Sequence, residues 1–308
     1  MPVDTGDVLK KPCSVDEAFA YCAALTEAHY ENFPVASLFL PQEKRPYIQS
    51  VYAFSRTADD FADERSRTVE ERLALLDDWE QKLSGCYEGK AEHPVFIALS
   101  ETVRRHAIPV ELMKDLLAAF RQDVVQSRYR TFDELLGYCR RSANPVGRIV
   151  LLIFGHAEER LFGLSDDVCT ALQLANFWQD VDLDRAKDRL YIPLEDFHTY
   201  GYSLQKWEAG VADDSFRQMM SFETGRTRDL FYRGAELPAA VNKELQIELK
   251  LVWLGGMAIL KKIDKSRYDV FRHRPKLSAY DKAMIFVRGF FLNDLTRFGK
   301  KKKPWDLT

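Results

Sequence analysis

The stretch Tyr52-Ala53-Phe54-Ser55-Arg56-Thr57-Ala58-Asp59-Asp60-Phe61-Ala62-Asp63 decides the fold class that we predict for this chain. Its polar side chains recur four, three and four residues apart, at Tyr52, Arg56, Asp59 and Asp63. That spacing places them along one stripe of a helix. Alanine and phenylalanine fill most of the other positions, and charges in apolar surroundings are costly to bury unless they have partners. The stretch therefore predicts a helix whose charged stripe has a binding role.

A second stretch, from Gln173 to Tyr191, repeats this pattern. Its amide and acidic side chains follow one another at steps of three, four and four residues, at Gln173, Asn176, Asp180 and Asp184. Apolar residues occupy most of the intervening positions, and Arg189 and Tyr191 follow shortly after the last aspartate. We expect a second helix with a polar stripe of the same kind.

Apolar residues recur at helical spacing along almost the whole chain, for example in residues 73–83, 112–120 and 245–252. Alternating, strand-like runs are scarce, so we predict an all-α fold: a single domain over residues 1–308, built as a helical bundle around a central cavity, with a basic tail at about 298–308. Thr131 to Glu134 is typical of a capped helix start. Ser165 to Asp167, after a break at Gly163, is expected to open the helix that carries the second acidic stripe.

Composition narrows the class of protein. The 308 residues include 44 basic and 47 acidic side chains, a balance that provides no general field for nucleic acid. The amino-terminal residues lack the pattern of a signal peptide, and no apolar run approaches the roughly 20 residues of a membrane-spanning helix. The five cysteines are scattered, as in a protein with reduced thiols. We therefore expect a cytoplasmic protein.

The paired aspartates indicate a chemistry. One acidic cluster is usually a solvated surface, but two clusters with the same four-residue spacing favour bound cations. Mg²⁺ prefers hard oxygen ligands, and typically takes one or two carboxylates together with the phosphates of a substrate. We therefore expect Mg²⁺ to bind a diphosphate at these metal ligands: Asp59, Asp63, Asp180, Asp184 and Asn176.

The two stretches resemble the squalene/phytoene synthase family, and the similarity extends over most of the chain. The segment from His29 to Ser37 resembles the family's substrate segment near the amino terminus. Ser142 to Arg148 resembles the helix with the family's central glycine, here Gly147, and Tyr268 to Phe271 resembles its late signature.

Within the family, two segments are similar to the bacterial hydroxysqualene synthases of hopanoid biosynthesis: Glu31 to Ser37 and Ser142 to Arg148. Asn32-Phe33-Pro34 stands where condensing members usually have Ser-Phe-Tyr. The second acidic stretch lacks a common Gly-Glu pair, and Gly255-Gly256 lies where several condensing members have a tyrosine. These departures speak against the full two-step condensing reaction.

The resemblance implies a lyase that converts presqualene diphosphate and water into hydroxysqualene and diphosphate, with Mg²⁺ and without NADPH. The catalytic residues would be Asp59, Asp63, Asp180, Asp184 and Tyr52. The substrate-binding residues would be Arg56, Arg189, Gln173, Asn176, Tyr191, Asn32, Phe33, Asn144 and Gly147. An apolar lining would shield the carbocation, and its candidates are Phe33, Phe54, Leu151, Phe154, Phe177 and Phe291, although for any one of them ordinary core is the favoured interpretation.

Two alternatives remain at this point. One is a transferase that condenses two farnesyl diphosphates to presqualene diphosphate or dehydrosqualene. The other is a family member without catalysis that acts as an assembly factor, a hypothesis that the complete set of aspartates and arginines disfavours. The lysine-rich tail, Lys300 to Lys303 before Trp305, suits peripheral contact with the inner membrane surface, although such tails are more often simply solvated.

Overall fold

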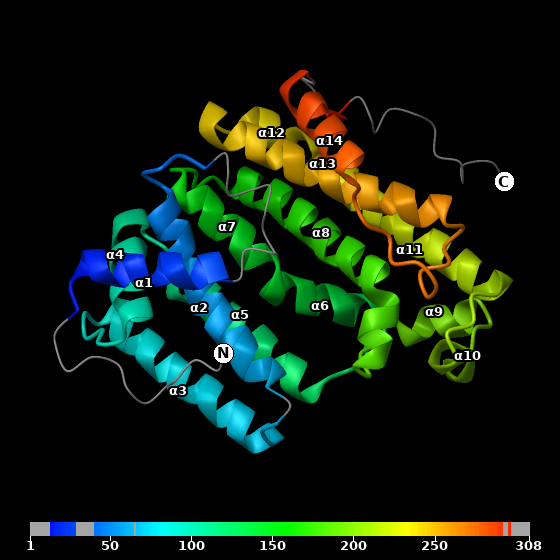
Figure 1. Cartoon of the computed structure of the whole chain (residues 1–308), viewed down its shortest axis with the longest axis horizontal. Helices are drawn as coiled ribbons and strands as arrows, with labels where there is room; N and C mark the ends of the chain where they lie inside the picture. Colours follow the sequence, from blue (N-terminus) through cyan, green and yellow to red (C-terminus); the bar gives the residue numbers. More distant parts are fainter. Residues whose placement is uncertain (1–12, 29–39, 65, 292–294, 297–308) are drawn as a thin grey trace. The chain divides into compact units, whose positions relative to one another are not determined.

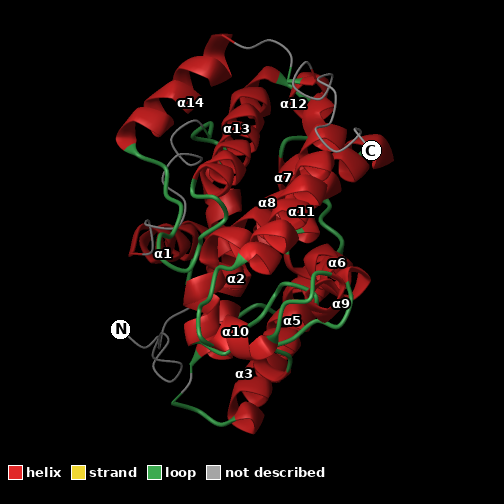
Figure 2. Cartoon of the chain, turned by 90° about the vertical axis from the view of Figure 1, so that its right-hand side faces the viewer, coloured by secondary structure: helices red, strands yellow, loops and turns green. Residues whose placement is uncertain are grey.

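The structure is a computed structural model that describes residues 13–28, 40–64, 66–291 and 295–296. Helices dominate the described residues, and their only sheet-like pairing is an isolated bridge between Arg128 and Leu190 (Figure 2). The all-α prediction is confirmed. Contacts gather the chain into two compact units, one of residues 1–126 and 145–157 and the other of residues 127–144 and 158–308. The single-domain assignment stays a prediction, and each unit is described by itself.

The first unit contains six helices among its described residues: α1 (Val15–Ala28), α2 (Arg45–Asp63), α3 (Val69–Tyr87), α4 (Pro94–His106), α5 (Val110–Val125) and α7 (Asn144–Ile153, from residue 145 on). Helix α2 packs against α1, α3, α4 and α5 (Figure 1). The core is aromatic: Trp79 of α3 packs against Phe54 of α2 and Phe96 of α4, with 6.1 and 4.5 Å between ring centres. The Trp79 indole also donates a hydrogen bond to the Phe54 carbonyl at 3.3 Å, which satisfies its buried polar group.

The second unit contains α6 (Phe132–Ser142), α8 (Glu159–Ala186), α9 (Leu194–Thr199), α10 (Leu204–Glu208), α11 (Asp214–Arg233), η2 (Gly234–Glu236), α12 (Leu237–Ala240), α13 (Lys243–Lys265) and α14 (Ala279–Phe291). Helix α8 packs against α6, α11 and α13, and α14 packs on α13 (Figure 1). Two buried indoles fix this packing. Trp178 of α8 donates to the Thr227 hydroxyl of α11 at 2.8 Å, and Trp253 of α13 donates to the Phe231 carbonyl at 2.7 Å.

Two expected helix starts have different outcomes. Helix α6 begins at Phe132, and the Thr131 hydroxyl accepts a hydrogen bond from the Glu134 amide, as predicted. The expected start at Ser165 was wrong, because α8 begins at Glu159 and continues through Gly163. Helix α8 buries Leu161, Ser165 and Val168 on one continuous face, and this tertiary packing outweighs the local preferences for a break.

No helix in the described ranges has the length and apolar character required to cross a bilayer.

One residue of the predicted apolar lining was assigned wrongly. Phe291, at the end of α14, is 80% exposed and lines no described cavity. Phe54 is fully buried in the aromatic core of the first unit.

A glycine pair on α13 provides a test of the packing in the second unit. A Cβ at Gly256 would collide with the buried Phe231 ring and lie 3.0 Å from Leu172, whereas a Cβ at Gly255 would meet nothing within 4 Å. Gly256→Ala should lower the free energy of unfolding by roughly 1–3 kcal/mol through overpacking. Gly255→Ala, the matched control, should raise it by about 0.5–1 kcal/mol because alanine favours the helix. Urea unfolding measures both, and a Gly256→Ala variant as stable as the parent would contradict the close packing.

A half-buried histidine, His93, makes the stability of the first unit depend on pH. His93 caps α4 by accepting a hydrogen bond from the Val95 amide at 3.2 Å, and it packs against Trp79. Burial, together with nearby Lys82 and against the effect of Asp78, lowers the pKa of His93 from 6.5 to about 4. Between these two pKa values the histidine binds a proton in the unfolded chain but not in the folded chain. The free energy of unfolding should therefore fall as the pH drops from about 6.5 toward about 4.

His93→Asn keeps a side chain that caps well but removes the titration. Urea midpoints measured between pH 7 and pH 4.5 should show a shallower loss in the variant than in the parent. Parallel curves would mean that His93 does not titrate in this range.

Candidate functional site

The first acidic stripe lies on α2, in the first unit. Its apolar side, which includes Val51, Phe54 and Ala58, is buried. This burial leaves the polar stripe at the margin of the core, where Tyr52, Arg56 and Asp59 are half-buried and Asp63 is exposed. The helix forms as predicted, with Pro46 in its first turn, a position where the missing amide hydrogen costs nothing.

Arg56 organises this stripe. Its Nη1 atom lies 3.5 Å from Asp59 Oδ2, and its Nη2 atom donates to Asp60 Oδ1 at 2.5 Å. Its Nε atom is buried without a hydrogen-bond partner. The guanidinium thus offsets the charge of two neighbouring carboxylates. Asp60, which sequence reasoning left out of the site, is the carboxylate that Arg56 contacts more closely.

The second acidic stripe lies on α8, in the second unit. Its opposite face buries Leu174, Trp178 and Val181 against neighbouring helices. As a result, Gln173, Asp180 and Asp184 are half-buried, while Asn176 is exposed. The structure therefore confirms that this stripe lies on one helix, and it shows that the four side chains differ in their exposure.

Burial changes the acidity of the last aspartate. It raises the pKa of Asp184 to about 7, and the neighbouring Asp180 adds to the effect. Arg189, Lys187 and Arg274 act in the opposite direction. Two carboxylates one turn apart repel each other when both are ionised, so this pair is suited to receive added positive charge.

Arg274 is the residue of this region that sequence reasoning missed. Its Nε atom donates to Asp180 Oδ1 at 2.5 Å and its Nη2 atom to Asp180 Oδ2 at 3.0 Å, a two-point contact that suits the planar guanidinium. The Gln179 side chain holds the following residue by donating to the Pro275 carbonyl at 2.5 Å. The signal in the sequence was the basic run from Arg272 to Arg274, which resembles a solvated surface until α8 is placed beside it.

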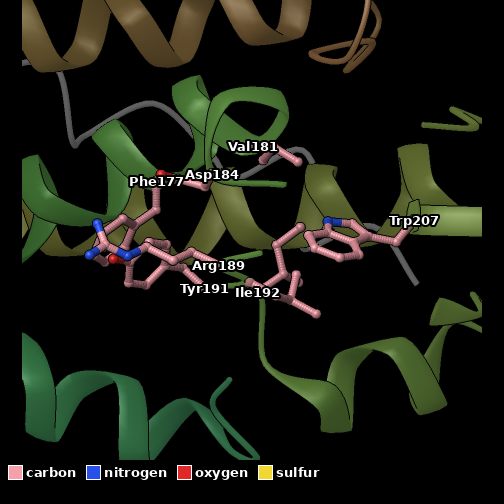
Figure 3. A pocket seen from close by; sticks show the side chains of 8 residues that line it. Phe177, Val181, Asp184, Arg189, Tyr191, Ile192 and Trp207 are labelled. Atoms are coloured by element: carbon pink, nitrogen blue, oxygen red, sulfur yellow. The ribbon is translucent and has the colours of Figure 1, made fainter. Parts of the chain in front are cut away.

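A small cavity of about 10 Å³ lies among three of the predicted residues of this unit, Asp184, Arg189 and Tyr191 (Figure 3). This is about the space that one water molecule requires. Its lining combines the acidic end of α8 with the segment that follows it: Phe177, Val181, Asp184, Arg189, Leu190, Tyr191, Ile192 and Trp207. Asp184, Arg189 and Tyr191, which sequence reasoning grouped together, therefore meet at one cavity.

The turn after α8 brings Arg189 back to the helix end. Asp188 adopts a left-handed backbone conformation (φ 58°), and the Arg189 amide donates to the Asp184 carbonyl at 2.8 Å. The Tyr191 ring stacks on Phe177 with 3.7 Å between ring centres and 8° between planes. Buried Tyr129 stacks on the same tyrosine at 5.8 Å. Aromatic packing therefore fixes the orientation of Tyr191.

The remaining predicted residues fall in different places. Asn144 is buried, and its Oδ1 atom accepts a hydrogen bond from Thr170 of α8 at 2.9 Å. Gly147 is half-buried on α7 in the first unit. Asn32 and Phe33 lie outside the described residues.

The aspartates of both stripes offer carboxylate oxygen atoms, the ligand type that a hard divalent cation prefers. Among the described residues, no three side chains of His, Cys, Asp or Glu converge on one point as metal ligands would. The residues that fit Mg²⁺ by their chemistry are the aspartates of each stripe, since the neighbouring carboxylate that raises the pKa of Asp184 is the kind of repulsion a cation relieves.

Comparison with known proteins relates this arrangement to a family. The family model described as Squalene/phytoene synthase matches residues 26–281. A hydroxysqualene synthase of Sinorhizobium fredii is 38% identical over 276 residues, 88% of this chain and 91% of that protein. A 15-cis-phytoene synthase of a Synechocystis species is 31% identical over 283 residues, 86% of this chain and 82% of that protein.

A solved structure supports the same relation. The squalene synthase HpnC of Alicyclobacillus acidocaldarius is 41% identical, with a TM-score of 0.80 over 84% of this chain and 97% of the solved chain. Family model, relatives and solved structure agree, and the chain belongs to the squalene/phytoene synthase family.

Proposed function

We propose that this protein is a hydroxysqualene synthase, a lyase that converts presqualene diphosphate and water into hydroxysqualene and diphosphate in hopanoid biosynthesis. Members of its family are enzymes that act on prenyl diphosphates. The observation that carries the proposal is the group at the end of α8, where half-buried Asp180 and Asp184 lie among the cations Arg189 and Arg274. The 38% identity to a hydroxysqualene synthase supports the finer assignment.

The reaction begins when the carbon–oxygen bond to the diphosphate breaks and its electron pair leaves with the diphosphate. Negative charge then develops on the leaving group, and fixed cations stabilise it. Arg189 and Arg274 of the second unit can supply such charge, as can Arg56 of the first unit. Arginine suits the task because its planar fork donates to two phosphate oxygens at once.

We assign Mg²⁺ to the same step, with Asp59, Asp63, Asp180, Asp184 and Asn176 as the residues that would hold it. When bound, the cation supplies Lewis-acid stabilisation of the diphosphate. The carboxylates would position it, and Asp180 also holds Arg274 in place through their two hydrogen bonds. Gln173 lies on the same stripe and is assigned to bind a phosphate oxygen.

The carbocation left on the substrate rearranges, and a water molecule adds to it. The water oxygen forms the new carbon–oxygen bond. One of the two water protons stays in the hydroxyl group, and the other leaves to solvent or to the diphosphate. Aromatic and aliphatic side chains protect such a cation from premature capture. Tyr52 and Asn144 are the described polar residues that we assign to positioning the water. Asn144 is suited to this because Thr170 anchors its carbonyl oxygen. The product forms without reduction, so NADPH has no part in the scheme.

A condensing synthase is the second candidate, and a specific observation favours it: the 31% identity to a phytoene synthase extends over 86% of the chain. Such an enzyme joins two prenyl diphosphates and acts as a transferase. It needs the same leaving-group chemistry, so the acidic stripes serve either reaction. A non-catalytic assembly role would not require the four aspartates of the two stripes.

The product assay distinguishes these candidates. Purified protein is incubated with Mg²⁺ and presqualene diphosphate, without NADPH, and in parallel with farnesyl diphosphate alone. We expect hydroxysqualene in the first reaction and no C30 product in the second, by mass spectrometry of the extracted lipid. A C30 diphosphate or hydrocarbon from farnesyl diphosphate alone would establish the transferase instead, and no product in either would favour the assembly role.

Substitutions test the acidic stripes separately from the choice of reaction. Asp59→Ala or Asp180→Ala should reduce turnover by about 10²–10³-fold, since each removes a carboxylate that would hold the cation that stabilises the leaving diphosphate. Mg²⁺ with inorganic diphosphate should raise the melting temperature of the parent, because a ligand of the folded state alone stabilises it. Asp180→Ala should lose this shift while it keeps a folded-state circular dichroism spectrum.

Asp167→Asn is the matched control, an aspartate on the same helix that pairs with Arg233 at 2.7 Å near the surface. It should retain both turnover and the melting shift. An Asp180→Ala variant with the parent's turnover would remove Asp180 from the site.

A further inference from the structure

Helix α14 exposes an unusual number of large apolar side chains. Among the described residues, it carries five of the thirteen large hydrophobic side chains that are exposed: Tyr280, Phe286, Val287, Phe290 and Phe291. The other eight are scattered singly over several elements. Single exposed apolar residues are ordinary, whereas a cluster of them marks a surface that binds something.

The five side chains share one side of the helix because the opposite side packs against α13. Gly289 faces α13 so closely that a Cβ there would lie 2.7 Å from Leu251, and Asp281 pairs with Lys262 of α13 at 2.7 Å. Figures 1 and 2 show α14 lying along α13. On the outer side, the Phe286 and Phe290 rings pack together with 4.8 Å between centres. We call these five side chains the outer face of α14.

The two charged side chains that α14 fully exposes are both basic. Lys282 and Arg288 are exposed on the same helix, and the acidic Asp281 is already paired with Lys262. In sequence, residues 272–303 contain ten basic and two acidic residues, in a chain whose net charge is −3. The lysines at 300–303 and Trp305 belong to this part of the sequence and lie outside the described residues.

We propose that the outer face of α14 docks this protein onto an anionic lipid bilayer. Aromatic and aliphatic side chains of a helix that lies in the interface enter the boundary between headgroups and acyl chains. Basic residues beside them gain attraction from anionic lipids, about 1 kcal/mol for each charge near the surface. A second copy of the chain fits this surface less well, since a symmetric contact would bring two strongly basic segments together. The proposal is independent of which reaction the enzyme catalyses.

Vesicle flotation with the full chain tests the proposal. The probes are vesicles of phosphatidylcholine alone and of phosphatidylcholine mixed with phosphatidylglycerol. We expect the parent to float with the anionic vesicles at low salt, with weaker binding to the neutral vesicles and at high salt. The double variant Phe286→Ser with Phe290→Ser should bind the anionic vesicles about tenfold more weakly, because it removes two of the exposed rings that would enter the bilayer.

Val125→Ser with Leu204→Ser is the matched control, since it removes two exposed apolar side chains from other elements. It should float like the parent, and melting curves should show that both double variants are folded. Equal flotation of the two double variants would overturn the proposal. Failure of the parent to float would also overturn it. In that case, light scattering would be measured on the parent and on the α14 variant. A dimer that is present in the parent and lost in the variant would identify a second copy of the chain as the occupant of this face.

Discussion

Charged side chains on helices that are otherwise buried must find partners, and this constraint explains most of the polar architecture of both units. On α2, Arg56 lies between the core and two carboxylates and offsets both. On α8, Asp180 accepts two hydrogen bonds from Arg274, while burial raises the pKa of Asp184 to about 7. Without such compensation, neither helix could bury its apolar side and keep its acids.

The same rule applies to a buried group that has no part in the proposed reaction. Arg226 of α11 donates to Glu223 at 2.5 Å and to Asp196 at 2.7 Å, and its guanidinium lies 3.5 Å from the centre of the Phe132 ring. Glu223 is fully buried, so its pKa is raised well above the ordinary value. Two carboxylates and one guanidinium hold α9 and α11 together, with the aromatic ring of α6 covering the cation. Here buried charge fixes the position of elements rather than binding a ligand.

Water capture and condensation begin with the same bond cleavage, so acidic stripes like those of α2 and α8 would serve either reaction. The relatives at 38% and 31% identity bear the names of two different synthases, hydroxysqualene synthase and 15-cis-phytoene synthase. The difference between the reactions lies in what reaches the cation, water or a second prenyl chain. Product analysis is therefore more informative about this protein than any substitution of its aspartates.

The sequence by itself determined the helical class, both polar stripes and the family, because these depend on local spacing. A step of three or four residues always returns to the same side of a helix, so Asp180 and Asp184 had to share a face. Likewise, the Thr131 cap depends on atoms three residues apart, and it forms as predicted. Only the tertiary structure decided the partner of Asp180, since Arg274 lies 94 residues away. It also decided the start of α8 at Glu159 and the outward direction of the α14 aromatics, because both depend on which neighbouring helix covers which side.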